Sequence, residues 1–237
     1  MRKFRYRKLS TKGTPMVYKL GVLVKGSSNT TKADEAFQLL RRQIVTMQIP
    51  PGAVLDERII AAQLGIGRTP LREALARLAE QKLVITFRHR NSQVAPLALS
   101  DVAYIHEIRV PLESLAARLA AQRATERDIE TIRNLLAQYE TVALRGDYQA
   151  AVETDYAFHD ACAQASHNLY LIDAINRLNS HSQRLWFISL KTVGAMDRIV
   201  ESHRQIYEAI ARHDSDEAER LMREHVNNFR ERIRSAL

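Results

Sequence analysis

The stretch that decides the fold is Leu64-Gly65-Ile66-Gly67-Arg68-Thr69-Pro70-Leu71-Arg72-Glu73. A helical segment over 57–64 leads into it, and a second helix is expected from Thr69 to about Gln81. Thr69 is a good N-cap, and Pro70 suits the first helical position, where a backbone N–H would have no helical partner. Two short helices joined by a glycine-containing turn predict a helix-turn-helix motif.

The flanking segments extend this motif on both sides. Upstream, Ala36, Leu39, Leu40, Ile44 and Met47 recur at helical spacing before Pro50-Pro51-Gly52 ends the segment. Downstream, two strand-like runs over 84–87 and 92–95 flank Arg88-His89-Arg90-Asn91, which predicts a β-hairpin with a basic tip. We therefore expect a winged helix-turn-helix domain over residues 33–99.

Residues 100–237 have a different pattern, with little Gly or Pro and no strand-like alternation. Six amphipathic segments are expected, at about 101–123, 125–145, 147–166, 169–190, 195–213 and 214–235. Capping residues separate them, namely Ser100, Thr125, Gly146-Asp147 and His213-Asp214-Ser215-Asp216. The fold class is thus mainly α, with the winged domain followed by an antiparallel six-helix bundle.

The positive charge is unevenly distributed. Residues 1–32 carry nine Lys or Arg and no acidic residue, which accounts for most of the net charge of +8 and the pI of about 9.8. Residues 33–99 carry a net +3 and residues 100–237 a net −4. We expect 1–32 to be a disordered arm, either a solvated tail or a contact to DNA, unless translation begins at Met16. The remaining asymmetry favours DNA binding by the first domain alone.

Two features exclude other classes of protein. No apolar run approaches the roughly 20 residues that span a bilayer, so neither membrane insertion nor a signal peptide is expected. A single cysteine, Cys162, excludes an internal disulfide framework. Both observations predict a cytoplasmic protein.

The start of the second helix of the motif carries the candidate base-reading residues. Arg68 and Arg72 lie four residues apart on one face, and arginine pairs bidentately with guanine in the major groove. Thr69 can offer its hydroxyl to a phosphate, and Arg58 on the preceding helix can contact the backbone or a base. Solubilising charge is the alternative, but the motif and the basic hairpin tip (Arg88, His89, Arg90) favour DNA binding.

The stretch from Leu55 to Leu75 resembles the signature of the GntR family of bacterial regulators. The resemblance implies that Arg58, Arg68, Thr69 and Arg72 are the main DNA contacts and that the wing tip enters the minor groove. Three positions depart from the family pattern. Gly67 replaces a serine or threonine, Lys82 replaces a glycine, and Asn91 stands where the wing usually carries glycine.

Four residues of the bundle form a candidate metal site. Asp155 and His159 share one helix face at i and i+4, and His203 and His225 lie among apolar neighbours on two later helices. A carboxylate and three imidazoles suit Zn²⁺ best, with Ni²⁺ or Mn²⁺ as alternatives. Taken singly, each histidine is better explained as an ordinary core or surface residue than as a metal ligand.

Residues 100–237 also resemble the FadR C-terminal (FCD) effector domain, through Glu107–Glu113, Asp155–His159 and Ala165–Asn168. That resemblance implies a divalent metal held by the aspartate and three histidines, with a small carboxylic acid bound to the metal. Six helices point to the VanR-like branch. Candidate effector contacts are Arg109, Asn168, His181 and Arg184, although Arg109 could instead pair with Glu113. His89, His106, His167 and His213 are assigned to the wing or surface.

These features predict a regulator without enzymatic activity. The expected form is a homodimer that binds a pseudo-palindrome in double-stranded operator DNA. The family resemblance implies an operator core of the GT…AC type and a repressor that is released by its effector acid. Two alternatives for the bundle remain. One is a metal-dependent hydrolase or oxygenase, and the other is a dimerisation domain with no small-molecule site.

Overall fold

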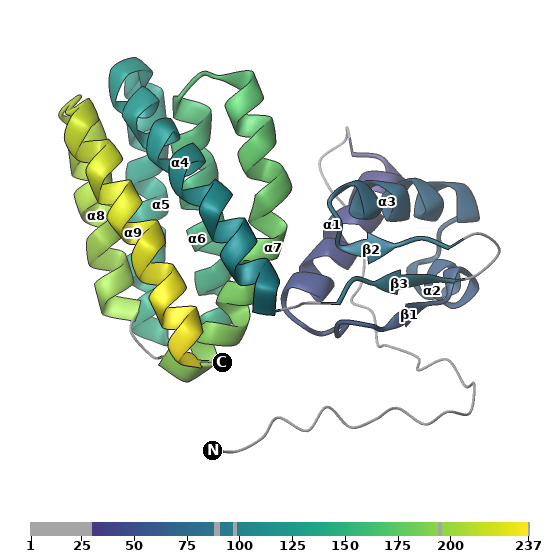
Figure 1. Ribbon diagram of the computed structural model, residues 1–237. Helices are drawn as coiled ribbons and strands as arrows, with labels where there is room; N and C mark the ends of the chain where they lie inside the picture. Colours follow the sequence, from purple (N-terminus) through teal and green to yellow (C-terminus); the bar gives the residue numbers. More distant parts are fainter. Residues whose placement is uncertain (1–29, 88–90, 97–98, 194–195, 237) are drawn as a thin grey trace.

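In the computed structural model of the protein, residues 30–87, 91–96, 99–193 and 196–236 are described. Most of the predicted arm and the wing-tip residues Arg88, His89 and Arg90 lie outside these ranges. Two parts lie side by side (Figure 1): an N-terminal part with a small sheet, and a helical part. No helix in the described ranges is long and apolar enough to cross a membrane.

The N-terminal part has the predicted helix-turn-helix and wing. Its sheet is antiparallel with strand order β1-β3-β2, and Val54 pairs with Gln93 while Val84 pairs with Val94. The short strand β1 was not predicted from the sequence. Its elements are α1 (Lys32–Val45), β1 (Val54–Leu55), α2 (Glu57–Leu64), α3 (Arg68–Glu80), β2 (Val84–Ile85) and β3 (Ser92–Val94).

The start of α3 differs from the prediction. Gly67, in an extended conformation, is the N-cap, and the helix begins at Arg68. Thr69 and Pro70 therefore occupy the second and third helical positions, and the N-cap role predicted for Thr69 is wrong. Pro70 is still tolerated there because the first four N–H groups of a helix have no helical acceptor. The Thr69 side chain is exposed.

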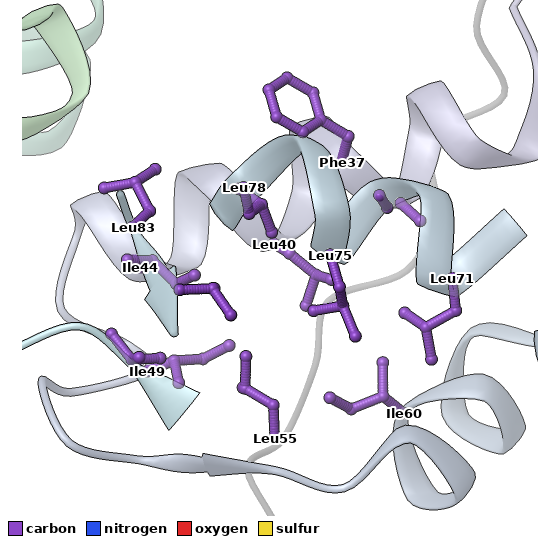
Figure 2. Packing of buried hydrophobic residues seen from close by; sticks show 14 of the residues in the cluster. Phe37, Leu40, Ile44, Ile49, Leu55, Ile60, Leu71, Leu75, Leu78 and Leu83 are labelled. Atoms are coloured by element: carbon purple, nitrogen blue, oxygen red, sulfur yellow. The ribbon is translucent and has the colours of Figure 1, made fainter. Parts of the chain in front are cut away.

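Leucine and isoleucine side chains from α1, α2, α3 and the sheet form the core of the N-terminal part (Figure 2). Leu40, Ile44, Leu71 and Leu78 are fully buried in it. The turn between α2 and α3 depends on Gly65, whose φ of 63° lies in the left-handed region and ends α2. This packing fixes α3 relative to the wing.

Six helices make up the described helical part, as predicted. They are α4 (Leu99–Arg123), α5 (Glu126–Arg145), α6 (Tyr148–Ala165), α7 (Leu169–Val193), α8 (Met196–Ala211) and α9 (Ser215–Ala236). Thr125 forms a capping box with Asp128, and Asp147 accepts from the first backbone N–H groups of α6. The predicted cap Ser100 instead lies inside α4, because that helix begins at Leu99, two residues before the predicted start at Asp101.

Helix α7 lies next to the N-terminal part and contacts it (Figure 1). Arg41 of α1 donates to Ser180 and Gln183, and His181 lies 2.8 Å from the backbone oxygen of Gln81. Val45 of α1 packs into an apolar cluster of the helical part. Movement of α7 would therefore displace the residues of the N-terminal part that contact it.

Candidate DNA-reading surface and metal centre

Three of the predicted DNA-reading arginines share one surface. Arg58 from α2 and Arg68 and Arg72 from α3 line an open concavity of about 910 Å³, together with side chains of the wing. All three are exposed. The Arg72 Nε donates to Glu57 Oε2 at 2.8 Å, so α2 orients the side chain that α3 presents. The surface is positively charged and open, as binding to a DNA groove requires.

The wing is tied to α2 by a polar contact. Asn91 Nδ2 donates to Asp56 Oδ2 at 3.3 Å, and Asp56 also caps α2 through the N–H groups of Arg58 and Ile59. Of the positions that depart from the family pattern, Lys82 adopts a left-handed φ of 55°. At Asn91 the side-chain amide serves as a hydrogen-bond donor to Asp56.

The four predicted metal ligands come together inside the helical part. Asp155 and His159 on α6, His203 on α8 and His225 on α9 each present one ligand atom, and these atoms lie within 4.8 Å of one another. The Nε2 atoms of His159 and His225 are 3.2 Å apart, and His203 Nε2 lies 3.5 Å from Asp155 Oδ1. The three histidines are buried, and His203 stacks on Phe158.

Contacts behind two of these histidines determine which ring nitrogens face the centre. His159 Nδ1 lies 2.7 Å from Glu113 Oε2. Ser202 donates its hydroxyl to the backbone oxygen of Ile199, so the same hydroxyl accepts from His225 Nδ1 at 2.8 Å. With each Nδ1 acting as a donor, both Nε2 atoms present lone pairs toward each other. A proton or a metal ion between them is needed to remove that repulsion.

Glu113 is the charged residue of this centre that the sequence interpretation did not assign to it. Burial opposes its ionisation, but Arg109 and His159 hold the pKa of its carboxyl well below the usual range. Burial likewise opposes protonation of His159, yet Glu113 outweighs it and raises the pKa of that imidazole. Arg109 Nε donates to Glu113, which is the alternative pairing considered for Arg109. The i, i+4 spacing of Arg109 and Glu113 was the available signal.

A small pocket adjoins the four ligands. Arg109 lines it, together with residues that the sequence interpretation did not assign to an effector pocket: Tyr156, Asn179, Ser182, Gln183, Trp186, Ile199 and Phe229. The other three predicted effector contacts lie elsewhere. Asn168 accepts from the N–H of Leu171 at the start of α7, and His181 and Arg184 bond to the backbone oxygens of Gln81 and Ala95. Helical periodicity cannot tell which side of α7 faces the pocket.

The sequence interpretation was wrong about the exposure of one histidine, His106. His106 is buried on α4, with Nε2 3.0 Å from Asn227 Oδ1 of α9, although it was assigned to the surface. His167 and His213 are exposed, as expected. The α4–α9 contact that covers His106 joins segments about 120 residues apart, and no local pattern signals it.

A winged helix-turn-helix joined to a helical bundle, with arginines on the recognition helix, defines a class of DNA-binding regulator. Two family models match the chain: "Bacterial regulatory proteins, gntR family" over residues 32–94 and "FCD domain" over residues 104–228. The chain belongs to the GntR family and carries an FCD domain. The family consists of transcription regulators and not of enzymes. The alternative that the bundle is a metal-dependent hydrolase or oxygenase is therefore not retained.

Named relatives match over most of their length. The "Probable D-xylose utilization operon transcriptional repressor" of Paenarthrobacter nicotinovorans is 31% identical, over 84% of this chain and 87% of the relative. "HTH-type transcriptional repressor RspR" of Escherichia coli K12 is 28% identical, over 84% and 88%. The solved structure titled "E. coli McbR/YncC" has the same fold, with a TM-score of 0.76 at 22% identity, and covers 84% of this chain and 95% of that one.

Proposed function

We propose that this regulator is a repressor whose DNA binding is controlled by a small carboxylic acid bound at a divalent metal in the helical part. In this proposal residues 33–99 bind the operator, and residues 100–237 bind the effector and dimerise. The operator is a short pseudo-palindrome, because a two-fold symmetric dimer presents two recognition helices to the two half-sites.

The observation that carries the metal proposal is the pair of facing Nε2 atoms of His159 and His225. In a tetrahedral site, ligand atoms about 2.0–2.1 Å from one zinc ion lie about 3.3–3.4 Å from each other, and the observed separation of 3.2 Å is close to this. Glu113 and Ser202 contact the Nδ1 atoms of the two rings and orient them, as the hydrogen-bond partners of metal-bound histidines do. A divalent ion held by these four residues would leave coordination positions open for a carboxylate, with Zn²⁺ preferred over Ni²⁺ or Mn²⁺.

On the DNA side, Arg68 and Arg72 read bases, while Arg58 and the exposed Thr69 hydroxyl contact the backbone. Arg88, His89 and Arg90 of the wing tip complete the contacts in the minor groove. This assignment is supported by the exposed surface that Arg58, Arg68 and Arg72 share. Any contribution of the arm over 1–32 is electrostatic, and deleting it would then lower the salt dependence of DNA binding.

Metal analysis combined with DNA binding tests the proposal. We expect about one divalent ion per chain in the purified wild type and none in the His203→Ala, His225→Ala double variant. Acids that release operator DNA from the wild type should have no effect on the double variant. The matched control is His167→Ala, an exposed histidine paired with Asp128 away from the centre. Stoichiometric metal in the double variant would refute the ligand assignment.

A further inference from the structure

The metal pocket as it stands is nearly closed. Its volume is about 20 Å³, which is enough for about one water molecule. A carboxylic acid needs more room, so part of the pocket wall has to move when it binds. Which side chains of the wall move determines which residues outside the pocket the bound acid contacts.

One wall separates this pocket from a larger groove between the two parts of the molecule. The groove has a volume of about 580 Å³ and lies between α1 of the N-terminal part and α6 and α7 of the helical part. Tyr156 and Gln183 line both spaces. A ligand that displaces either side chain therefore enters the groove between the two parts.

On the groove side, that wall is covered by Arg41 of α1. Its guanidinium carbon lies 4.8 Å from the centroid of the Tyr156 ring, and Nη2 donates to Gln183 Oε1 at 2.8 Å. Nε donates to the Ser180 hydroxyl at 2.9 Å. These hydrogen bonds and the ring contact are all to uncharged groups.

The neighbouring charges of the groove are already paired. Arg42 lies 3.3 Å from Glu153, and Asp34 accepts from Arg77 at 2.7 Å. None of the ion pairs found within the described ranges includes Arg41. Burial lowers the pKa of the Arg41 guanidinium, against the opposing effect of Tyr156 and Asp160. A partly buried guanidinium bonded only to neutral acceptors is a favourable partner for a carboxylate, which it can bind bidentately.

We infer that Arg41 is an effector-binding residue contributed by the N-terminal part, and that the effector is a dicarboxylic acid. One carboxylate binds at the centre formed by Asp155, His159, His203 and His225, and the other passes the wall of Tyr156 and Gln183 to pair with Arg41. This inference rests on the proposed function of the metal pocket.

The arrangement links effector binding to the placement of the N-terminal part. A carboxylate on Arg41 replaces its bonds to Ser180 and Gln183, which hold α1 against α7. Ser180 also donates to the Gln81 side chain, next to the end of α3. The effector thus has different affinities for the arrangement in which α1 is bonded to α7 and for one in which these bonds are broken. Such a difference in affinity is what a ligand needs in order to shift the populations of two arrangements.

Calorimetry on the zinc-loaded, full-length protein tests this. Saturated dicarboxylates of three to six carbons are compared with monocarboxylates of the same length. We expect the wild type to bind its best dicarboxylate about ten- to a hundredfold more tightly than the matched monocarboxylate. Arg41→Gln should lose this preference while its affinity for the monocarboxylate stays within about twofold. Arg41→Lys keeps the positive charge but cannot bind a carboxylate bidentately. Its preference for the dicarboxylate should lie between those of the wild type and Arg41→Gln.

The matched control is Arg42→Gln, because Arg42 lines the same groove but pairs with Glu153. It should retain the wild-type preference. Equal affinity for both acid classes in the wild type, or equal weakening of both by Arg41→Gln in protein shown to be folded by circular dichroism, would overturn the role of Arg41 and leave the metal pocket intact. Failure of every acid to bind the zinc-loaded wild type would instead reject the proposed function.

Discussion

Arg72 shows how one side chain can be positioned by a neighbouring helix. It lies in the first turn of α3, is about two-thirds exposed, and is held by Glu57 of α2. Arginine in this position can read guanine through two parallel hydrogen bonds, which is worth about 1–3 kcal/mol of discrimination. Solvent surrounds most of the side chain, so its removal should affect binding and not folding.

Arg72→Ala is therefore expected to weaken binding to an operator selected by the wild type about 5- to 150-fold. Binding to a scrambled duplex of equal length should change little. Fluorescence anisotropy on both duplexes gives the ratio, with exposed Arg145→Ala on α5 as the control. A variant that keeps the wild-type ratio would show that Arg72 does not read bases.

Lys82 carries backbone strain at the end of the recognition helix. Its φ of 55° is left-handed, and its side chain is exposed. That conformation costs a non-glycine residue about 1–2 kcal/mol, of which the greater backbone freedom of unfolded glycine offsets about 0.5–1 kcal/mol. Lys82→Gly should therefore stabilise the protein by about 0.5–1 kcal/mol.

Urea unfolding of wild type, Lys82→Gly and Lys82→Ala measures this effect. The alanine variant is the control, since it removes the charge and keeps the Cβ, and its stability should match the wild type. A glycine variant no more stable than the alanine variant would mean that the strain is relieved elsewhere in the turn.

At the scale of elements, Asp34 joins two helices. It completes the capping box of α1 with Thr31 and accepts from Arg77 of α3 at 2.7 Å. Hydrogen bonds from Thr31 and Arg77 lower the pKa of the Asp34 carboxyl from its ordinary 3.8 to about 2. Since the folded pKa is depressed, the ionised group stabilises the fold above about pH 4, and this contribution is lost as the pH falls through about 2.

Asp34→Asn should accordingly melt at a lower temperature than the wild type at pH 7, and the difference should shrink between pH 4 and pH 2. Thermal unfolding followed by circular dichroism across that range tests the sign. Glu130→Gln, which breaks the exposed pair with Arg133, serves as the control and should show almost no difference at any pH. A gap that stays constant with pH would exclude the charged form of Asp34 as the cause.

Sequence periodicity was sufficient for the helices and insufficient for the small strand β1. Apolar spacing and caps are local signals, so α5 and α6 begin within one residue of the expected positions. Strand β1 has only two residues and exists through its pairing with β3, about 38 positions later. Its formation depends on the tertiary contact, and no local pattern could have revealed it.

At the scale of the whole molecule, α4 presents an apolar stripe that the described helices leave exposed. Tyr104, Ile108 and Leu115 are 63%, 50% and 42% exposed, and their spacing of four and seven residues places them on one helix face. Exposed apolar stripes of this kind commonly mark protein interfaces. The stripe supports the proposed homodimer, with a second copy of the chain as its partner.

Ile108→Asp should therefore shift the protein from dimer to monomer, raising the dimer dissociation constant at least about tenfold, because an unpaired buried charge opposes association. Sedimentation velocity over a concentration series measures the shift. Leu144→Asp is the matched control, because Leu144 is 89% exposed but lies near the end of α5. If only the Leu144 variant dissociates, the interface lies elsewhere on the molecule.

The sequence by itself determined the helix-turn-helix, the six-helix bundle and the four residues of the candidate metal centre. Helical periodicity, capping residues and residue chemistry are properties of short stretches of sequence, so they can be recognised without a structure. Tertiary structure alone decided that His181 and Arg184 contact the N-terminal part, that Glu113 and Ser202 orient the histidines, and that Arg41 covers the pocket wall. Arg41 and Gln183 are 142 positions apart, and such contacts arise from how whole helices pack, which no local pattern encodes.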